Sequence, residues 1–260
     1  MTSAPPRHSP MARLASTYWV DSSRPLASLV FVTPLLIIYE MGVLVLGPQA
    51  VRNGADVWLR QLLEWVGFGQ YFLLPVLTVS ILLGWHYTTR QPWRLSSSIL
   101  YGMISECVLL AICLWLLLQL QGSLFHSLMG AGDQAPPQVV VALSISGKIR
   151  GGIGFLGAGV YEELLFRLIL LSLVGWVLRR LGTGRGLSIV AAVLLTSLTF
   201  AVAHYVGPYG ESWQWASSSF WFSFLFRFLA GVFFSVLFVQ RGFGIAAGTH
   251  AGYDILVGLF

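Results

Sequence analysis

An apolar run of the chain, residues 151–178, contains three ionisable side chains: Glu162, Glu163 and Arg167. As a helix, this run is long enough to cross the roughly 30 Å hydrocarbon core of a bilayer. A charge at that depth costs about 2.5–3.5 kcal/mol on insertion scales. Such residues therefore point either to a functional site or to a buried charge cluster that fixes helix packing, and both interpretations stay open on these residues alone.

The two glutamates are expected to face different neighbours. Glu163 and Arg167 are four residues apart, which places them on one helix face within reach of an ion pair. Glu162 lies about 100° around the helix from Glu163. The spacing predicts one glutamate paired with arginine and one left free for another role.

Two later apolar segments each carry a histidine. His204 follows Phe200 by four residues and His250 precedes Asp254 by four, so each pair shares a helix face. An aspartate one turn from His250 can orient the imidazole ring and fix its tautomer. A lone histidine near a helix end is ordinarily an interfacial residue, and that interpretation stays open for His204.

Facing inward from three helices, these polar groups would surround a water molecule or a metal ion. A glutamate and a histidine can polarise water for attack on a carbonyl, and a second imidazole can hydrogen-bond the oxyanion that forms. This is the chemistry of peptide hydrolysis, and an apolar lining would confine it to a membrane substrate. The candidate catalytic residues are Glu162, His204, His250 and Asp254.

The composition indicates an integral membrane protein. Of the 260 residues, 56% are hydrophobic and 10% are charged, whereas a soluble domain averages about 25% charged. The net charge of +5 comes from arginines beside apolar spans. Positive-inside topology and contact with a lipid bilayer explain them, so no nucleic-acid partner is expected. The two cysteines, Cys107 and Cys113, fall on different faces of one segment and predict neither a disulfide nor a metal pair.

The pattern predicts an all-α fold, a polytopic transmembrane bundle of about seven spans with one amphipathic interfacial helix at residues 54–66. Residues 139–145 are apolar but too short to cross, and are expected to be interfacial or re-entrant. The predicted spans cover residues 26–46, 71–85, 98–120, 151–178, 187–205, 220–239 and 243–260.

Three parts of the chain are expected. Residues 1–24 are polar and proline-containing, and predict a disordered cytoplasmic tail. Residues 25–138 hold the first three spans and the interfacial helix, and residues 139–260 hold the catalytic half.

Charge counting also predicts the orientation. It places the N-terminus, the loops 86–97 and 179–186, and Arg241 in the cytoplasm. Arg52 and Arg60 then fall outside, partly balanced by Asp56 and Glu64. The chain is expected in a bacterial cytoplasmic membrane with its N-terminus inside.

The polar residues of the C-terminal half resemble one known family, the CPBP intramembrane proteases (CAAX-protease and bacteriocin-processing, also called Abi). The similarity covers roughly residues 139–260 and implies an all-α intramembrane endopeptidase. Three motifs carry it, in order on successive apolar segments: Glu162-Glu163-x-x-x-Arg167, Phe200-x-x-x-His204 and His250-x-x-x-Asp254.

The resemblance implies roles for the motif residues. Glu162 with His204 would activate the catalytic water, and His250 with Asp254 would form the oxyanion side. In CAAX-processing relatives the last motif residue is often Asn, so Asp254 departs from that pattern. The supporting residues would be Glu163 and Arg167.

The resemblance leaves the cofactor and the substrate open. The family is often described as metalloproteases, although a metal-free, glutamate-activated water is also argued for it. The partner would be a membrane protein or peptide. With His204 near the outer end of its span, extracytoplasmic cleavage is favoured over prenylated CAAX substrates. A Zn²⁺ or another divalent metal would take three ligands: Glu162, His204 and His250.

Two alternatives from other classes remain: a non-catalytic membrane scaffold or immunity protein, and a proton-coupled carrier. A carrier predicts carboxylates spread along a path and paired broken helices, whereas this chain concentrates polar groups in its C-terminal half. Outside the motifs, Arg227 is expected to pair with Glu106 or Glu40. Gly231 and Gly248 are expected to permit close helix approach.

Overall fold

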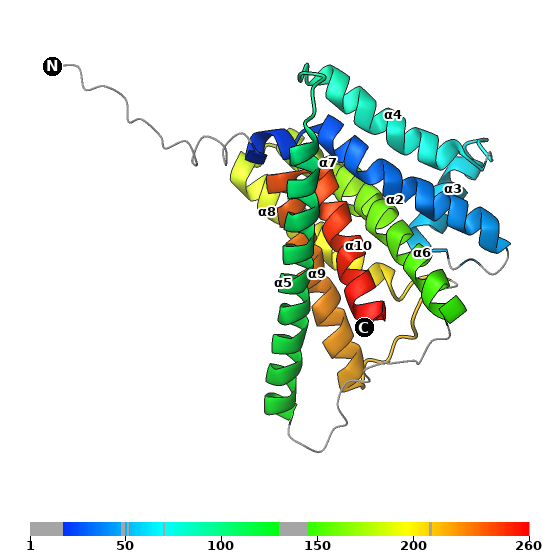
Figure 1. Cartoon of the computed structure of the whole chain (residues 1–260). Helices are drawn as coiled ribbons and strands as arrows, with labels where there is room; N and C mark the ends of the chain where they lie inside the picture. The colour runs from blue at the N-terminus through cyan, green and yellow to red at the C-terminus, as the bar shows by residue number, and fades with distance from the viewer. Residues whose placement is uncertain are drawn as a thin grey trace.

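The computed structural model of the chain describes residues 18–47, 50, 52–69, 71–129, 145–207 and 210–259. Within these ranges every regular element is helical, which confirms the predicted all-α class (Figure 1). The elements are α2 (Pro25–Leu46), α3 (Gly54–Trp65), α4 (Leu73–Thr88), α5 (Ser97–Met129), α6 (Ile145–Glu162), η2 (Glu163–Leu171), α7 (Ser172–Arg180), α8 (Arg185–Ala203), α9 (Ser218–Arg241) and α10 (Phe243–Leu259).

The lengths and compositions of the helices are those of an integral membrane protein. Among the described residues, four helices are long and apolar enough to span a bilayer: Pro25–Leu46, Ser97–Leu128, Arg185–Ala203 and Ser218–Arg241. Helix α4 is apolar but shorter, and α6, η2 and α7 follow one another without a break over residues 145–180. Each of the seven predicted spans falls on a helical segment, the last of them on α10. Four of the described helices meet the length and hydropathy expected of a membrane span.

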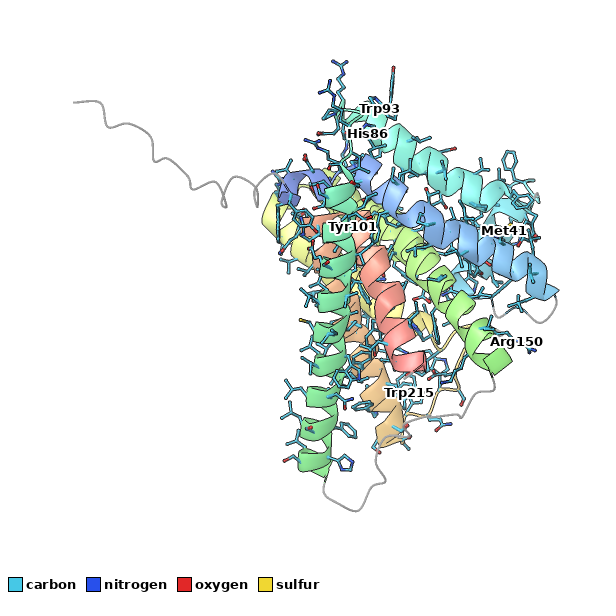
Figure 2. All side chains as sticks on the ribbon, in the orientation of Figure 1. Met41, His86, Trp93, Tyr101, Arg150 and Trp215 are labelled. Atoms are coloured by element: carbon cyan, nitrogen blue, oxygen red, sulfur yellow. The ribbon has the colours of Figure 1, made fainter. Side chains whose placement is uncertain are left out.

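Helix α10 lies at the centre of the bundle. It packs against α5 and α6 most extensively, and also against α2 and α9. In Figure 1 it runs between α5 and α6, with α2 on the other side of α6 and α4 packed against α2. Large apolar side chains such as Met41, Tyr101 and Trp215 point away from this core (Figure 2), as expected for a surface in contact with lipid.

One predicted boundary differs from the structure, and another lies largely outside the described residues. Helix α5 continues to Met129 instead of ending near residue 120. Beyond residue 120 it is held to α9, because Gln121 is buried and its amide donates to the Phe222 carbonyl at 2.8 Å. The segment predicted to be interfacial, 139–145, lies outside the described residues up to residue 144, and α6 begins at Ile145.

Most of the predicted tail, residues 1–17, lies outside the described residues. Residues 18–22 form a short helix, and Arg241 at the end of α9 donates to the Trp19 carbonyl at 2.9 Å. The same guanidinium pairs with Glu106 at 2.6 Å, and Tyr18 also donates to Glu106. These contacts hold residues 18–22 against α5 and the end of α9, so this part of the predicted tail is folded. They also bring it and Arg241 to one end of the bundle, in agreement with the positive-inside count.

Two glycines predicted to permit close helix approach do so. A Cβ atom at Gly231 would lie 3.0 Å from the Cα of Ser197 on α8, and one at Gly248 would lie 2.5 Å from the Phe31 ring. The prediction is confirmed for both. Gly242 has a different role: its φ of 81° makes the turn that separates α9 from α10.

Gly159 brings α6 into backbone contact with α10. A Cβ atom there would lie 2.6 Å from the Cβ of Ala251 and 2.7 Å from the carbonyl oxygen of Ala247. Glu162 lies one turn further along α6, so this contact sets its distance from His250 on α10.

Gly159→Ala is therefore expected to separate the two helices. We expect the free energy of unfolding to fall by about 1–3 kcal/mol and proteolysis to fall by about 10²-fold, because an ångström of misplacement is enough for such a loss. Thermal denaturation in detergent and precursor processing in cells measure the two effects. The matched control is Gly152→Ala, on the same helix with no atom within 4 Å of the added Cβ. Equal behaviour of the two variants would contradict the prediction.

Candidate active site

The helix that carries the first motif changes its pitch within the motif. Helix α6 ends at Glu162, and Glu163 begins η2, a nine-residue π-helical segment. Widened i→i+5 turns are rare and occur frequently at functional sites. The sequence pattern predicted a regular helix here and contained no signal for the π segment.

The predicted ion pair between Glu163 and Arg167 is present. Their side chains are 3.0 Å apart, and both are almost completely buried. The guanidinium carbon of Arg167 lies 4.4 Å from the centre of the Phe200 ring and 5.4 Å from that of Phe234. The buried guanidinium of Arg167 is thus stabilised by the Glu163 carboxylate and by contact with aromatic rings.

His250 is oriented by the same carboxylate. Its Nδ1 lies 2.7 Å from Oε1 of Glu163, and its ring stacks on Phe234 at 4.4 Å between centres. Since Glu163 is paired with Arg167 and can only accept, Nδ1 of His250 donates the hydrogen bond. Glu163 therefore sets the ring orientation, a role that the sequence had suggested for Asp254.

The other nitrogen of His250 faces two carboxylates. Its Nε2 lies 3.7 Å from Oε2 of Glu162 and 3.6 Å from Oδ2 of Asp254. Glu162 and Glu163 thus approach opposite nitrogens of one imidazole, as expected for adjacent residues that point in different directions. The structure brings Glu162, Glu163, Arg167, His250 and Asp254 together from two helices.

His204 stands at the C-cap of α8, within an aromatic setting. Its Nδ1 lies 2.8 Å from the carbonyl oxygen of Phe200, one turn earlier. A carbonyl accepts only, so Nδ1 carries the proton and Nε2 is the acceptor of the neutral ring. The ring contacts Phe200 edge-on at 4.9 Å. Phe200 in turn contacts Arg167, which links this histidine to the buried ion pair.

A pocket of about 130 Å³ joins Glu162 to His204. Both residues line it, together with Trp58 from α3, Phe166 from η2 and Glu211 from the segment before α9. A water molecule needs roughly 10–15 Å³ of such space. The pocket is therefore large enough for a water and a short stretch of substrate backbone beside the two predicted water-activating groups.

Glu162 has a further contact that the sequence did not reveal. Nδ2 of Asn53 donates to Oε1 of Glu162 at 2.5 Å. Asn53 is also the N-cap of α3, with its Oδ1 accepting from the backbone nitrogens of Ala55 and Asp56. An asparagine before an amphipathic helix predicts a cap, but sequence alone could not show that the same amide reaches a helix a hundred residues away.

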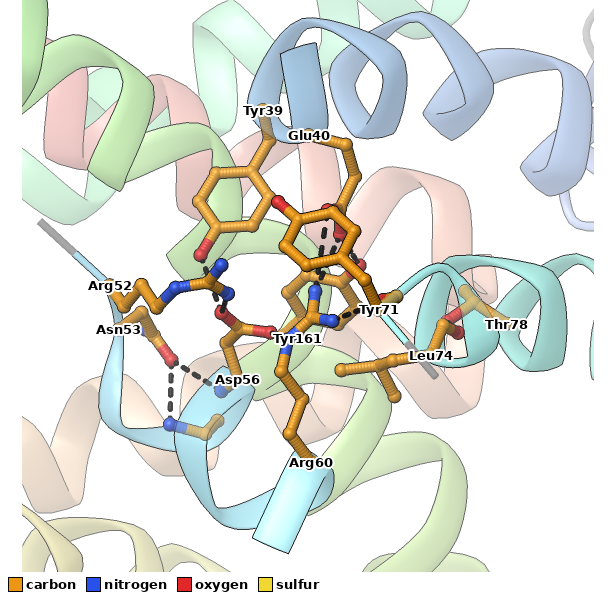
Figure 3. Close-up of polar contacts among 11 residues, drawn as sticks. Tyr39, Glu40, Arg52, Asn53, Asp56, Arg60, Tyr71, Leu74, Thr78 and Tyr161 are labelled. Atoms are coloured by element: carbon orange, nitrogen blue, oxygen red, sulfur yellow. Dashed lines mark hydrogen bonds and ion pairs between the residues drawn. The ribbon is translucent and has the colours of Figure 1, made fainter. Parts of the chain in front are cut away.

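A buried polar network lies behind Asn53 (Figure 3). Asp56 is fully buried and accepts hydrogen bonds from Tyr39, Arg52 and Arg60, at 2.8, 2.8 and 2.6 Å. Arg60 also pairs with Glu40 at 3.0 Å. Charges taken out of water in this way are satisfied by one another.

Arg227 has a partner other than the ones predicted. Its Nη1 donates to Oε2 of Glu211 at 3.0 Å, whereas Glu106 pairs with Arg241 and Glu40 pairs with Arg60. The expected pairing with Glu106 or Glu40 was therefore wrong. Arg227 lies in the first half of α9, close to the segment that begins at residue 210, and its carboxylate partner therefore comes from that segment.

The hydrogen bonds from Arg227 lower the pKa of Glu211 below its ordinary value of 4.5. A lowered carboxyl pKa means that the pair stabilises the fold above pH 4.5 and is lost as the pH falls further. Because the Glu211 side chain is 55% exposed, screening by solvent keeps this contribution below about 1 kcal/mol.

Arg227→Met is expected to increase amide hydrogen exchange in residues 210–217 at pH 7, because that segment loses its ionic anchor. The wild-type chain should show the same increase only on acidification below about pH 4.5. Global stability should change little. Equal exchange of the two chains at pH 7 would show that the pair does not anchor this wall of the pocket.

The residues suggested as metal ligands do not form a metal site in this arrangement. Within the described ranges, no group of three or more His, Cys, Asp or Glu side chains is placed to hold an ion. Nδ1 of His250 is engaged by Glu163 and Nδ1 of His204 by a carbonyl, so Nε2 is the nitrogen of each ring that is available to a water, a substrate or an ion.

One comparison with known proteins found a match, and it covers the part of the chain that carries the three motifs. Residues 146–256 match the family model described as type II CAAX prenyl endopeptidase Rce1-like. No curated protein and no solved structure matched the chain. The match supports peptide-bond hydrolysis within the membrane as the activity of the chain. The resemblance to the CPBP family of intramembrane endopeptidases, indicated by the three motifs, is therefore confirmed over residues 146–256.

Proposed function

We propose that this protein cleaves a membrane-anchored protein with a water molecule activated by Glu162 and His204. The observation that carries the proposal is the shared pocket: Glu162 and His204 come from different helices, yet both line one cavity, and His250 adjoins Glu162. The family match supports a protease, and this geometry supplies the residues for its chemistry.

In the first step the water oxygen attacks the carbonyl carbon of the scissile peptide bond. Its proton passes to the Glu162 carboxylate, with Nε2 of His204 as the second acceptor. In the second step the tetrahedral intermediate collapses, the C–N bond breaks, and the stored proton is delivered to the departing nitrogen. The products are a carboxylic acid and an amine, which become a carboxylate and an ammonium group when the acid proton passes to the amine, and Glu162 returns to its ionised form.

His250 is proposed to stabilise the oxyanion. Nδ1 donates to Glu163, so the ring needs a proton on both nitrogens for Nε2 to donate as well. The charge of such an imidazolium is balanced by the three surrounding carboxylates of Glu162, Glu163 and Asp254. Asp254 thus acts as an acceptor beside His250, a role in which an ionised aspartate suffices.

The pocket is proposed to open on the extracytoplasmic side. Helix α8 ends at Ala203, just before His204, and α9 then returns to Arg241, which contacts Trp19 at the opposite end of the bundle. Arg52 and Arg60 pair with Asp56 and Glu40 and not with the expected Glu64. Arg227 pairs with Glu211. These three arginines therefore do not count as free positive charge.

The test is a comparison of membrane proteomes from cells that carry the wild-type chain or Glu162→Gln. We expect one class of membrane-anchored protein to accumulate uncleaved with the variant, and the same class with His204→Ala. If every processing event is unchanged while the variant inserts normally, the proposed hydrolysis is wrong and the charge cluster is a packing element.

A further inference from the structure

The amide of Asn53 has only one orientation consistent with its contacts. Its Oδ1 accepts from the backbone nitrogens of Ala55 at 2.7 Å and Asp56 at 3.2 Å. An amide whose oxygen is used as a helix cap must present its nitrogen elsewhere, and Nδ2 meets Oε1 of Glu162 at 2.5 Å. The cap thus determines which end of the amide faces the carboxylate.

The position of Asn53 is held by the network behind it (Figure 3). Asp56, one turn into α3, is fully buried and bonded to side chains on both sides of it in the chain, including Tyr39 of α2. Helix α3 also packs directly against α6. The first turn of α3 therefore cannot move freely relative to Glu162.

The same network reaches Glu162 from a second direction. Tyr161, the residue before it, is fully buried and its hydroxyl donates to Glu40. Glu40 also accepts from Arg60, which is bonded to Asp56. Backbone and side chain at Glu162 are consequently both tied to one polar cluster contributed by α2 and α3.

We infer that Asn53 is a positioning residue for Glu162, so that residues 53–60, outside the family-matched region, complete the active site. By binding Oε1, Asn53 stops rotation of the carboxylate and leaves Oε2 toward Nε2 of His250. The inference rests on the proposed function, in which Glu162 is the water-activating group.

The alternative is that Asn53 only caps α3, and two variants separate these roles. Serine and aspartate cap helices about as well as asparagine, but neither can offer an amide nitrogen to Glu162. Asn53→Ser is expected to keep the wild-type melting temperature, and its KM should stay within about twofold of wild type. Its kcat should fall by about 10- to 100-fold. Asn53→Asp should lose at least as much, because it adds a second carboxylate beside the first.

The matched control is Gln121→Ala. It removes a buried hydrogen bond between α5 and α9 and touches none of the contacts of Asn53, Asp56 or Glu162. We expect this variant to melt at a lower temperature and to keep its kcat. The measurement uses the full-length chain in liposomes, with the precursor that accumulates in Glu162→Gln cells as substrate.

The outcomes distinguish this inference from the proposed function. A selective loss of kcat in Asn53→Ser, with the kcat of Gln121→Ala unchanged, supports the positioning role. Wild-type kcat in Asn53→Ser together with an inactive Glu162→Gln overturns the positioning role alone. An equal loss of kcat in Asn53→Ser and Gln121→Ala also overturns it, since lowered stability would then explain both. If Glu162→Gln processes every precursor normally, the proposed function itself fails.

Discussion

Glu162→Gln is expected to lower the rate of proteolysis by at least about 10³-fold without altering insertion or folding. Glutamine matches glutamate in shape and still presents an oxygen, but it cannot take a proton from water. The residue lines a pocket, and its removal as a base leaves His204 as the only other proposed acceptor there. The measurement is kcat/KM on the accumulated precursor, with melting temperature as the check on folding.

Variants of His204 test whether it acts together with Glu162. If Glu162 and His204 activate one water molecule, His204→Ala and the double variant should be nearly as inactive as Glu162→Gln, because groups that act as a unit lose their effect together. Additive losses would contradict a shared water. Residual activity of His204→Ala within tenfold of wild type would reduce that residue to an interfacial histidine, the alternative that its sequence position left open.

Arg167→Met is expected to have the largest effect on stability, about 3–5 kcal/mol lower. The substitution leaves Glu163, which is 0% exposed, without its cation in a site enclosed by aromatic rings. Glu163 also orients His250, so activity should fall with stability. Denaturation of the purified chain in detergent, at a fixed protein-to-detergent ratio, measures the change.

A double variant gives the control for this prediction. Replacing both partners, as Glu163→Gln with Arg167→Met, removes the uncompensated charge and should recover part of the lost stability. Activity should not recover, because glutamine is a weaker partner for Nδ1 of His250. A double variant as unstable as the sum of the two single variants would show that the ion pair contributes nothing beyond packing.

The residues around Glu162 come from two parts of the chain. The motif side chains all lie within the family-matched residues 146–256. Two helices outside that region, α2 and α3, contribute the polar cluster that contacts Glu162 and its neighbour Tyr161. The N-terminal part of the chain therefore borders the pocket directly, through Trp58 of α3.

The sequence was sufficient for the fold class, for the approximate course of the helices and for the set of candidate site residues. These follow from local rules: apolar length predicts spans, a step of four places Glu163 beside Arg167, and low charge content predicts a membrane environment. The same rules misplaced the end of α5, because the span was expected to end near residue 120, whereas a buried hydrogen bond from Gln121 to α9 lies within the longer helix.

What depended on tertiary structure was every relation between groups far apart in the chain. A one-dimensional pattern could not show that Glu163 approaches His250 more closely than Asp254 does. Nor could it show that Arg227 pairs with Glu211, or that the cap of α3 reaches Glu162. Such contacts are fixed by how helices pack, here by the glycine contact between α6 and α10 and by the buried network around Asp56. The chemistry of the residues is local, but their distances and directions are properties of the folded bundle.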